Sequence, residues 1–304
     1  MRSLIIHAGG KSERIREIMS NSLSKCWLEI NGLPIIVLNI LEFNNVVDEI
    51  LIIVNNQLKK EEFLKKLFQF DQLKILEKKI SLAIDDKTGF PNDHGPMLSL
   101  KTGIKLATQD IIISIPSDMP FLSKEIIQST EKYLQDNTIV TIQSKDYFNA
   151  LIFMSKRDEI VNLSTFSWRR VTDIYRLFPN VAFIPLSEEY SKFFIGINSN
   201  TDYELATKLA SNYVKQVKIL SDEKPKTLIR LIGINTEKEF KTLKTRSDDL
   251  FREKCYLLLI RLSIQNEIKI SQQIKELFKL ESKIWEPINK LINNHCLRDI
   301  ELIK

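Results

Sequence analysis

A cluster of glycines and cations near the start of the chain has the composition of a phosphate-binding loop. The segment from Ala8 to Arg14 follows a short apolar run, and Gly9 and Gly10 permit a sharp turn that brings bare backbone N–H groups to an anion. Lys11 and Arg14 add positive charge suited to a triphosphate. The loop has neither the Gly-Lys-Ser/Thr ending of a Walker P-loop nor the Gly-x-Gly-x-x-Gly pattern of dinucleotide-binding proteins. We expect a nucleotide-binding turn here, the alternative being an ordinary tight turn after a strand.

The second chemical feature is an aspartate that closely follows the most isoleucine-rich run of the chain. Asp118 lies just beyond Ile111–Ile115 and between two prolines, Pro116 and Pro120. Open α/β sheets bind ligands at the carboxyl ends of their strands. Mg²⁺ in proteins takes one or two carboxylates together with substrate phosphates. The position therefore predicts that Asp118 binds Mg²⁺, the alternative being a turn or helix-cap aspartate.

These groups need a scaffold that brings strand ends together, and the hydrophobic pattern predicts one. Near-continuous isoleucine and valine runs indicate strands buried on both faces, and segments of helical period separate them. The alternation predicts an α/β fold, a Rossmann-like three-layer αβα domain over residues 1–212 with a mostly parallel sheet. Strands are expected at Ser3–His7, Glu49–Val54, Ile80–Ile84, Asp110–Ile115, Thr138–Gln143, Ala150–Met154 and Val181–Ile184, and helices at Pro34–Phe43, Lys59–Phe70 and Pro96–Ala107.

Four motifs in a fixed order carry a resemblance to a known family. The Ala-Gly-Gly-x-Ser-x-Arg loop is followed by Lys25 and by a Gly-x-Pro-apolar-apolar helix start. The other motifs are Asp86 with His94-Gly95-Pro96-Met97, the stretch Pro116-Ser117-Asp118-Met119-Pro120-Phe121-Leu122, and the segment Phe193–Asp202. Together they resemble the nucleotidyltransferases of the GT-A-like fold, and among these most closely the molybdenum-cofactor guanylyltransferase-like (MobA-like NTP transferase) group. The resemblance covers roughly residues 3 to 210.

The resemblance implies a Mg²⁺-dependent nucleotidyltransferase in which matching positions carry the functions. It implies catalytic functions for Lys25, Asp118 and Arg14, and a Mg²⁺ site at Asp118 and Asn198. Plainer alternatives are a solvated loop lysine for Lys25 and a turn residue ahead of a helix for Asn198. The residues that the resemblance assigns to nucleotide binding are Ala8, Gly9, Gly10, Lys11, Asp86, Gly95 and Pro96.

The implied reaction needs no nucleophilic triad. An acceptor phosphate oxygen would attack the α-phosphorus of an NTP and displace pyrophosphate, and such an oxygen is already ionised at neutral pH. The protein then contributes positioning and charge neutralisation. The expected partners are an NTP, with GTP favoured, and a phosphorylated small-molecule acceptor.

Departures from the group's pattern leave the acceptor open. Lys25 follows the loop later than in the molybdenum-cofactor enzymes, which is more similar to the adenosylcobinamide-phosphate guanylyltransferases and the sugar-phosphate enzymes. The stretch Met97–Gly103 resembles the cytidylyltransferases, and Gly196 replaces the first Asn of the group's Asn-Ile-Asn-Thr segment. Gly9 and Gly10, where the cytidylyltransferases have Ala-Gly, favour guanine.

Residues 213–304 are expected to form a helical appendage. They carry 19 Lys and Arg against 13 Asp and Glu, so the tail holds the positive charge of the chain and the first 212 residues are close to neutral. Mixed charge of this kind usually marks a solvated helical surface, although a winged-helix-like module is the alternative. Nucleic acid is therefore a partner only through this tail. The rival to an enzyme is a nucleotide-binding sensor with a DNA-binding tail.

Composition sets the expected surroundings. No apolar run approaches the ~20 residues that a membrane span needs, and no signal peptide opens the sequence. The three cysteines are far apart, which gives neither a disulfide framework nor a zinc-ligand spacing. We expect a cytoplasmic monomer or homodimer without membrane contact.

Overall fold

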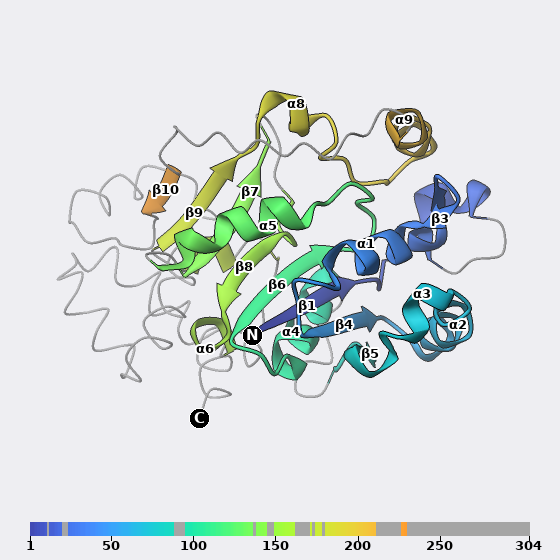
Figure 1. The fold of residues 1–304 in the computed structure, drawn as a ribbon, viewed down its shortest axis with the longest axis horizontal. Helices are drawn as coiled ribbons and strands as arrows, with labels where there is room; N and C mark the ends of the chain where they lie inside the picture. Colours follow the sequence, from blue (N-terminus) through green and yellow to red (C-terminus); the bar gives the residue numbers. More distant parts are fainter. Residues whose placement is uncertain are drawn as a thin grey trace, which may run out of the picture. The chain divides into compact units, whose positions relative to one another are not determined.

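The apolar runs of the sequence become neighbouring strands of one twisted sheet in the computed structural model (Figure 1). The structure describes residues 1–10, 12–19, 24–87, 95–135, 138–144, 149–161, 171, 174–177, 180–210 and 226–229. Across the sheet the strands follow one another as β9-β7-β8-β6-β1-β4-β5. Their bounds are β1 (Arg2–His7), β4 (Glu49–Val54), β5 (Ile80–Ile84), β6 (Ile111–Pro116), β7 (Ile139–Gln143), β8 (Phe153–Lys156) and β9 (Asn180–Pro185).

The register makes four strands end at a common level. β1 pairs in parallel with β4 and β6, and β4 pairs in parallel with β5. His7 lies opposite Pro116 of β6 and Ile53 of β4, and Val54 lies opposite Ile84 of β5. The predicted mostly parallel α/β sheet is confirmed. The loops that follow these four strands therefore share one edge.

One strand departs from its predicted bounds by more than one residue at an end. β8 begins at Phe153, three residues later than the expected Ala150, and runs antiparallel to both β6 and β7. The preceding residues form a turn instead, because the side chain and the carbonyl of Asn149 accept hydrogen bonds from the N–H groups of Leu151 (3.0 Å) and Ile152 (2.9 Å). Asparagine competes for backbone donors in this way and delays the start of a strand.

Helices cover both faces of the sheet. α4 (Pro96–Leu106) packs on β1, where Gly103 lies against Ile5. Figure 1 shows α1 (Ile35–Phe43) and α5 (Lys124–Thr130) on the opposite face. The other short elements are η1 (Glu13–Ile18), η2 (Lys25–Trp27), β2 (Glu29–Ile30), β3 (Leu33–Pro34), α2 (Gln57–Leu67), α3 (Asp71–Lys74), η3 (Glu77–Lys79), η4 (Glu131–Gln135), α6 (Arg157–Ile160), α8 (Glu188–Ser191) and α9 (Asn200–Ala210).

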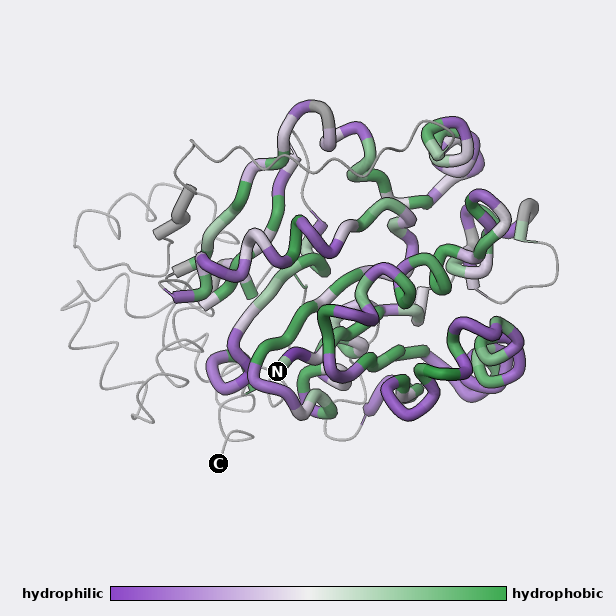
Figure 2. Tube along the Cα trace, viewed as in Figure 1, coloured by the Kyte–Doolittle hydropathy of each residue, from purple (hydrophilic) through white to green (hydrophobic). Residues whose placement is uncertain are grey.

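The core follows from the strand composition. Figure 2 shows hydrophobic residues along β1, β4 and β6, while the helices combine both characters. Leu4 and Ile6 of β1 join one large apolar cluster together with Ile36 and Ile40 of α1, all of them 2% exposed or less. Each fully buried side chain of this size contributes about 1.5–3 kcal/mol. This packing holds the strand ends in a fixed geometry.

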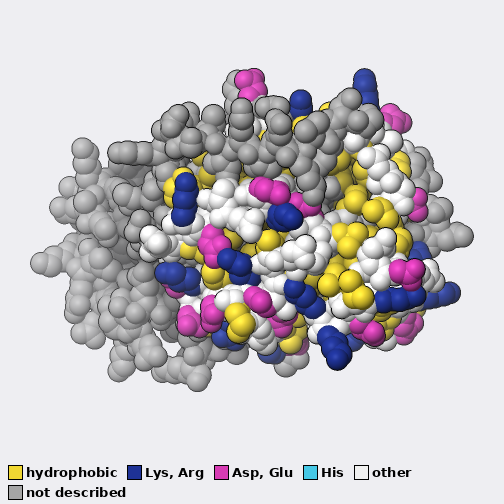
Figure 3. Space-filling model, viewed as in Figure 1, with side chains coloured by type: hydrophobic (Ala, Val, Ile, Leu, Met, Phe, Trp, Pro, Cys, Tyr) yellow, Lys and Arg dark blue, Asp and Glu magenta, His cyan; other side chains and the backbone are white. Residues whose placement is uncertain are grey.

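The sheet belongs to a unit formed by Met1–Ser164 and Ala182–Lys226. The second unit, Thr165–Val181 with Thr227–Lys304, contains α7 (Ile174–Leu177) and most of the short strand β10 (Lys226–Ile229). The predicted boundary at residue 212 and the expected helices beyond it lie outside the described residues. On the face drawn in Figure 3, basic and acidic side chains of the described part are interspersed. Within the described part, no helix combines the length and apolarity needed to cross a bilayer.

Candidate active site

The carboxyl ends of four neighbouring strands place the candidate residues in a row. In the order β5, β4, β1 and β6, the chain leaves these strands at Asp85, Asn55, the Gly9-Gly10 loop and Asp118. Adjacent strands lie about 4.8 Å apart, so the row spans roughly 14 Å. An extended ligand such as a nucleotide matches this length and linear order.

The glycine loop passes close to the neighbouring strand end. The N–H of Ala8 donates to the carbonyl of Ile53 at 2.8 Å, which extends the β1–β4 pairing by one bond. A Cβ on Gly9 would lie 3.3 Å from the Cβ of Asn55 and 3.7 Å from Oδ2 of Asp85, so the approach leaves little room for a side chain. A Cβ on Gly10 would meet no atom within 4 Å, so the outer side of the loop is open.

Of the two cations predicted in this loop, the structure describes Arg14. Arg14 lies on η1 with its side chain exposed, so it is accessible to a ligand. Lys11 lies outside the described residues. Ser12, the serine of the loop motif, was given no role in the sequence analysis; it has a left-handed backbone (φ 58°) and accepts a hydrogen bond from the N–H of Lys25 at 3.1 Å. Ser12 thereby fixes Lys25 to the glycine loop.

A buried lysine lies beneath the loop and was not predicted. Lys59, in the first turn of α2, donates its ammonium to the carbonyl of Gly9 at 3.4 Å and to the carbonyl of Gly10. Its side chain is buried, and this burial lowers its pKa. The lysine-rich sequence of α2 is typical of a solvated helix, so it does not indicate that Lys59 contacts the loop. The close approach of α2 to the loop reveals it.

The structure brings together Lys25, Asp118 and Asn198, three residues to which the resemblance assigns functions. The ammonium of Lys25 lies 2.5 Å from Oδ2 of Asp118 and donates to Oδ1 of Asn198 at 2.6 Å. It also donates to the carbonyl of Ile197 at 2.8 Å. The side chains of Lys25 and Asp118 are only 14% and 15% exposed, which strengthens their attraction. These residues lie far apart in sequence and converge because the Phe193–Asp202 segment returns to the end of β6.

The same oxygens fit a divalent cation. Oδ1 of Asp118 is buried without a hydrogen-bond partner, and buried carboxylate oxygens are rarely left so. Gly196 lies against this oxygen, because a Cβ there would be only 3.8 Å from it. Within the described residues no group of three or more His, Cys, Asp or Glu side chains could hold a metal ion. One carboxylate with amide and carbonyl oxygens suits Mg²⁺, which draws its remaining ligands from water and substrate phosphates.

The structure separates the two aspartates that follow β5. Asp86, the predicted nucleotide-binding residue, forms an ion pair with Lys105 at 2.7 Å, and its N–H donates to the hydroxyl of Thr102. Asp85 instead faces Gly9, and its Oδ1 is buried without a partner. Burial raises the pKa of Asp85 to about 7, against the opposing effects of Lys87 and Lys59. The signal for Asp85 was its place directly after the strand.

Gly95 and Pro96 open α4 as the motif predicted. Gly95 has φ 72°, a conformation that other residues rarely adopt, and Pro96 occupies the first helical turn. The first N–H groups of this helix lack intrahelical partners, so they are available to polar ligand atoms. At the same sheet edge, His7 is buried between the hydroxyls of Ser99 (2.8 Å) and Ser114 (2.9 Å). Burial lowers the pKa of His7 to about 3, so it links α4 to the sheet as a neutral residue.

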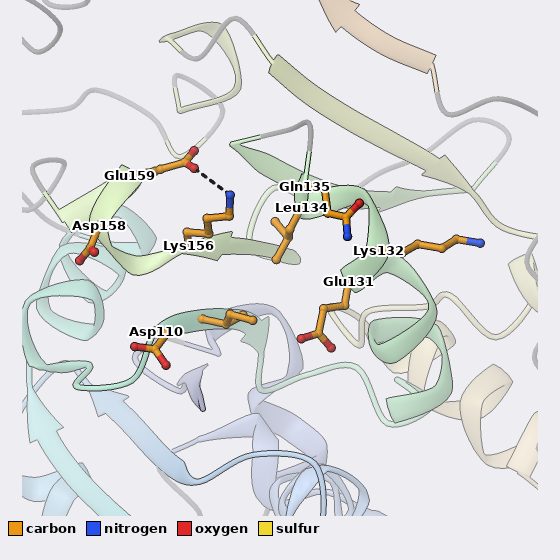
Figure 4. Close-up of a pocket in the computed structure, with 9 residues that line it drawn as sticks. Asp110, Glu131, Lys132, Leu134, Gln135, Lys156, Asp158 and Glu159 are labelled. Carbon is orange, nitrogen blue, oxygen red and sulfur yellow. Dashed lines mark ion pairs between the residues drawn. The ribbon is translucent and has the colours of Figure 1, made fainter.

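A separate cavity of about 630 Å³ lies at the other edge of the sheet (Figure 4). Ile111 begins β6 and Lys156 ends the antiparallel β8, so both lie at the edge opposite Asp118. Acidic and basic side chains mix in its lining, and Lys156 forms an ion pair with Glu159 at 3.5 Å. None of the candidate residues lines this cavity. The candidate residues therefore lie along the row of strand ends at the opposite edge, away from this cavity.

Comparisons with known proteins agree with this geometry. The model of the MobA-like NTP transferase domain matches residues 4–174. The chain is 28% identical over 176 residues to a 2-C-methyl-D-erythritol 4-phosphate cytidylyltransferase of Clostridium beijerinckii, covering 54% of this chain and 71% of that protein. It is 27% identical over 126 residues to a probable molybdenum cofactor guanylyltransferase of Methanosarcina acetivorans, covering 41% of this chain and 50% of that protein.

The fold is also similar to that of solved structures. A nucleotidyl transferase from Methanothermobacter superposes with a TM-score of 0.55 at 16% identity, covering 70% of this chain and 98% of that one. Identity this low supports the fold alone. The domain match over more than half of the sequence supports the family and the reaction class. The chain belongs to the MobA-like NTP transferase domain family and is a nucleotidyltransferase.

Proposed function

We propose that this protein transfers GMP from GTP to a phosphorylated small-molecule acceptor, with Mg²⁺ and with release of pyrophosphate. The observation that carries the proposal is the row of groups along the sheet edge. A nucleotide laid along this row has its base at the ends of β5 and β4, its phosphates at the β1 loop and its reacting end at Asp118.

Guanine fits the groups at the base end. Its Watson–Crick edge offers two adjacent N–H donors, and the unpartnered Oδ1 atoms of Asp85 and Asn55 are both acceptors. A carboxylate that accepts two donors at once binds more tightly than one that accepts a single donor. Cytosine and adenine present only one amino group on this edge. We therefore propose that Asp85, rather than the ion-paired Asp86, selects GTP.

Cations and backbone donors would hold the phosphates. Gly10 and its open outer side, with Lys11 and Arg14 nearby in sequence, form the phosphate loop, and Lys25 would turn from Asp118 toward the α-phosphate. Asp118 and Asn198 would hold Mg²⁺, which when bound neutralises charge on the phosphate oxygens. The start of α4 at Gly95 and Pro96 would contact the nucleotide through its free N–H groups.

The chemistry follows from this arrangement. A phosphate oxygen of the acceptor forms a bond to the α-phosphorus, and the bond from that phosphorus to the bridging oxygen of the β-phosphate breaks. The bond-breaking electrons leave with pyrophosphate. The attacking oxygen is already ionised, so no side chain has to remove a proton. Lys25 stabilises the charge of the α-phosphate oxygens in the transition state.

For the acceptor we propose molybdopterin. The Asp118-Met119-Pro120-Phe121-Leu122 stretch and the similarity to a probable molybdenum cofactor guanylyltransferase support it. The similarity to a cytidylyltransferase that acts on 2-C-methyl-D-erythritol 4-phosphate keeps sugar phosphates as the competing class, and cobinamide phosphate is a further candidate. The acceptor panel of the test therefore contains all three.

The test is pyrophosphate release from GTP, CTP, ATP and UTP with Mg²⁺ and each acceptor. We expect release with GTP and molybdopterin, and its loss in Asp118→Asn. The matched control is Asp110→Asn, because Asp110 lies at the opposite end of the same strand and is exposed. Release with a different base or acceptor would replace the assignment within the family. Equal rates in Asp118→Asn and Asp110→Asn would refute the metal site.

A further inference from the structure

Lys59 is a buried cation whose ammonium binds backbone carbonyls. Its side chain is 4% exposed, and Nζ donates to the carbonyls of Gly9 and Gly10. Carbonyl oxygens satisfy the hydrogen-bonding capacity of an ammonium group but do not neutralise its charge. Among the ion pairs described, none includes Lys59, and the acidic groups that act on it from a distance are Glu62 and Asp85.

This placement is unfavourable for stability. Asn56 caps α2 by accepting the N–H of Lys59 at 2.9 Å, which puts Lys59 in the first turn, at the positive end of the helix dipole. Taking a charge out of water is costly as well. Lys65 of the same helix is exposed and leaves its charge in solvent at no such cost. A residue that works against its local environment on two counts is best explained by function.

We propose that Lys59 is a positioning residue that sets the orientation of the nucleotide loop. In a trans peptide the C=O and the N–H point in opposite directions. When Lys59 draws the carbonyl of Gly9 inward, the N–H of Gly10 faces outward, toward the open side where a Cβ would meet no atom. A second bond to the carbonyl of Gly10 fixes the next peptide in the same way.

The charge of Lys59 adds to this orientation. The loop backbone lies between the buried ammonium and the proposed phosphate position, so Lys59 attracts the phosphates through the loop without touching them. Lys25 differs in this respect, because its side chain reaches Asp118 directly. The inference rests on the proposed nucleotide site and adds a determinant that lies outside the recognised motifs.

The test compares Lys59→Met with Lys60→Met, its neighbour on the same helix. Methionine keeps most of the volume and removes the charge and the donors. In Lys59→Met we expect the Kd for GTP to rise about tenfold to a hundredfold, the range for a hydrogen bond to a charged group. The kcat at saturating GTP should change much less. The thermal midpoint of the protein without nucleotide should stay equal or rise, because a buried charge has been removed. Lys60→Met should change none of these.

The thermal midpoint and the Kd for GTP together distinguish a structural role of Lys59 from a positioning role. A lower thermal midpoint with an unchanged Kd would overturn the inference. If Lys59→Met does not fold, Lys59→Leu also removes the charge and the donors; a Kd for GTP equal to that of the wild type would then overturn it. Absence of GTP binding in the wild-type protein would refute the proposed function and this inference together. Binding by the wild type and equal binding by the variants would refute the inference alone.

Discussion

Lys25 binds the same two side chains that the proposed metal ion would use. Its ammonium contacts Oδ2 of Asp118, Oδ1 of Asn198 and the carbonyl of Ile197. An ammonium group and a divalent cation cannot share these oxygens, since like charges this close repel strongly. In the proposed function, bound GTP offers its α-phosphate to Lys25 as another partner. Lys25 then leaves Asp118 and Asn198 free to hold the metal ion.

Lys25→Met should therefore bind metal more tightly when no nucleotide is present. We expect the Kd for Mn²⁺, measured by the loss of its free electron paramagnetic resonance signal, to fall by at least about tenfold because the competing charge is gone. Nucleotidyl transfer should fall at the same time. Lys105→Met is the control, because Lys105 forms a similar ion pair with Asp86 at 2.7 Å. Unchanged Mn²⁺ affinity in Lys25→Met would mean that Lys25 and the metal use different atoms.

Asp85 should make GTP binding depend on pH. Its pKa is raised to about 7, so part of the population is protonated at neutral pH. The proposed contact with the guanine N–H groups requires the ionised form. Below pH 7 the proton must first leave, and affinity should fall by about tenfold per pH unit. Above pH 7 affinity should level off.

The measurement is the Kd for GTP from about pH 6 to about pH 8, across the folded-state pKa. Asp85→Asn should bind more weakly at the upper end and lose the slope. Asp86→Asn serves as the matched control and should keep the slope, since its carboxylate is paired with Lys105. The same slope in Asp85→Asn as in the wild type would place the base elsewhere.

At the scale of elements, the contact between α4 and β1 sets the geometry of the site edge. α4 begins at Pro96 and contacts β1 closely at Gly103. A Cβ on Gly103 would lie 2.5 Å from Cγ2 and 3.0 Å from Cδ1 of Ile5. Ile5 is fully buried and cannot retreat. The two elements thus meet at a distance that only glycine allows.

Gly103→Ala should destabilise the protein. Alanine improves helix propensity by about 1 kcal/mol, whereas forcing atoms into a packed core costs about 1–3 kcal/mol. The cost of overpacking should exceed the gain in helix propensity, so the urea concentration at the midpoint of unfolding should fall. In an Ile5→Ala background, where Cγ2 and Cδ1 are absent, the same substitution should be neutral or stabilising. A stabilising effect of Gly103→Ala alone would show that the helix can move away from β1.

The sequence predicted the strands more accurately than the contacts between elements. β4 and β5 match their predicted bounds, because buried strands leave unbroken apolar runs. β8 was shifted because Asn149 forms a local turn that hydrophobicity does not record. The resemblance assigned functions to Lys25 and Asp118 but did not predict their ion pair. Lys59 escaped prediction because its importance comes from a contact between α2 and the glycine loop, which no local pattern encodes. Asp85 follows β5 directly, but the resemblance assigned nucleotide binding to its neighbour Asp86.

At the scale of the whole chain, the proposed transfer depends on residues that all precede the tail. The last of them, Asn198, lies two residues before α9, and α9 ends at Ala210. Residues 213–304, which carry the excess of basic side chains, are expected to form the helical appendage. Mixed charges of both signs predict a solvated surface more than a nucleic-acid interface.

A chain that ends at Ala210 should therefore keep both GTP binding and transfer, provided its urea unfolding remains cooperative. We expect no salt-sensitive retention of the full chain on duplex DNA. Retention through phosphate contacts would weaken steeply with salt, and retention through the tail would be lost on truncation. Loss of transfer in a cooperatively folded truncated chain would place part of the acceptor site beyond residue 210. Salt-sensitive DNA retention by the full chain, absent from the truncated chain, would favour the alternative of a nucleotide-binding sensor. The basic tail would then add electrostatic binding of nucleic acid to a nucleotide-binding fold.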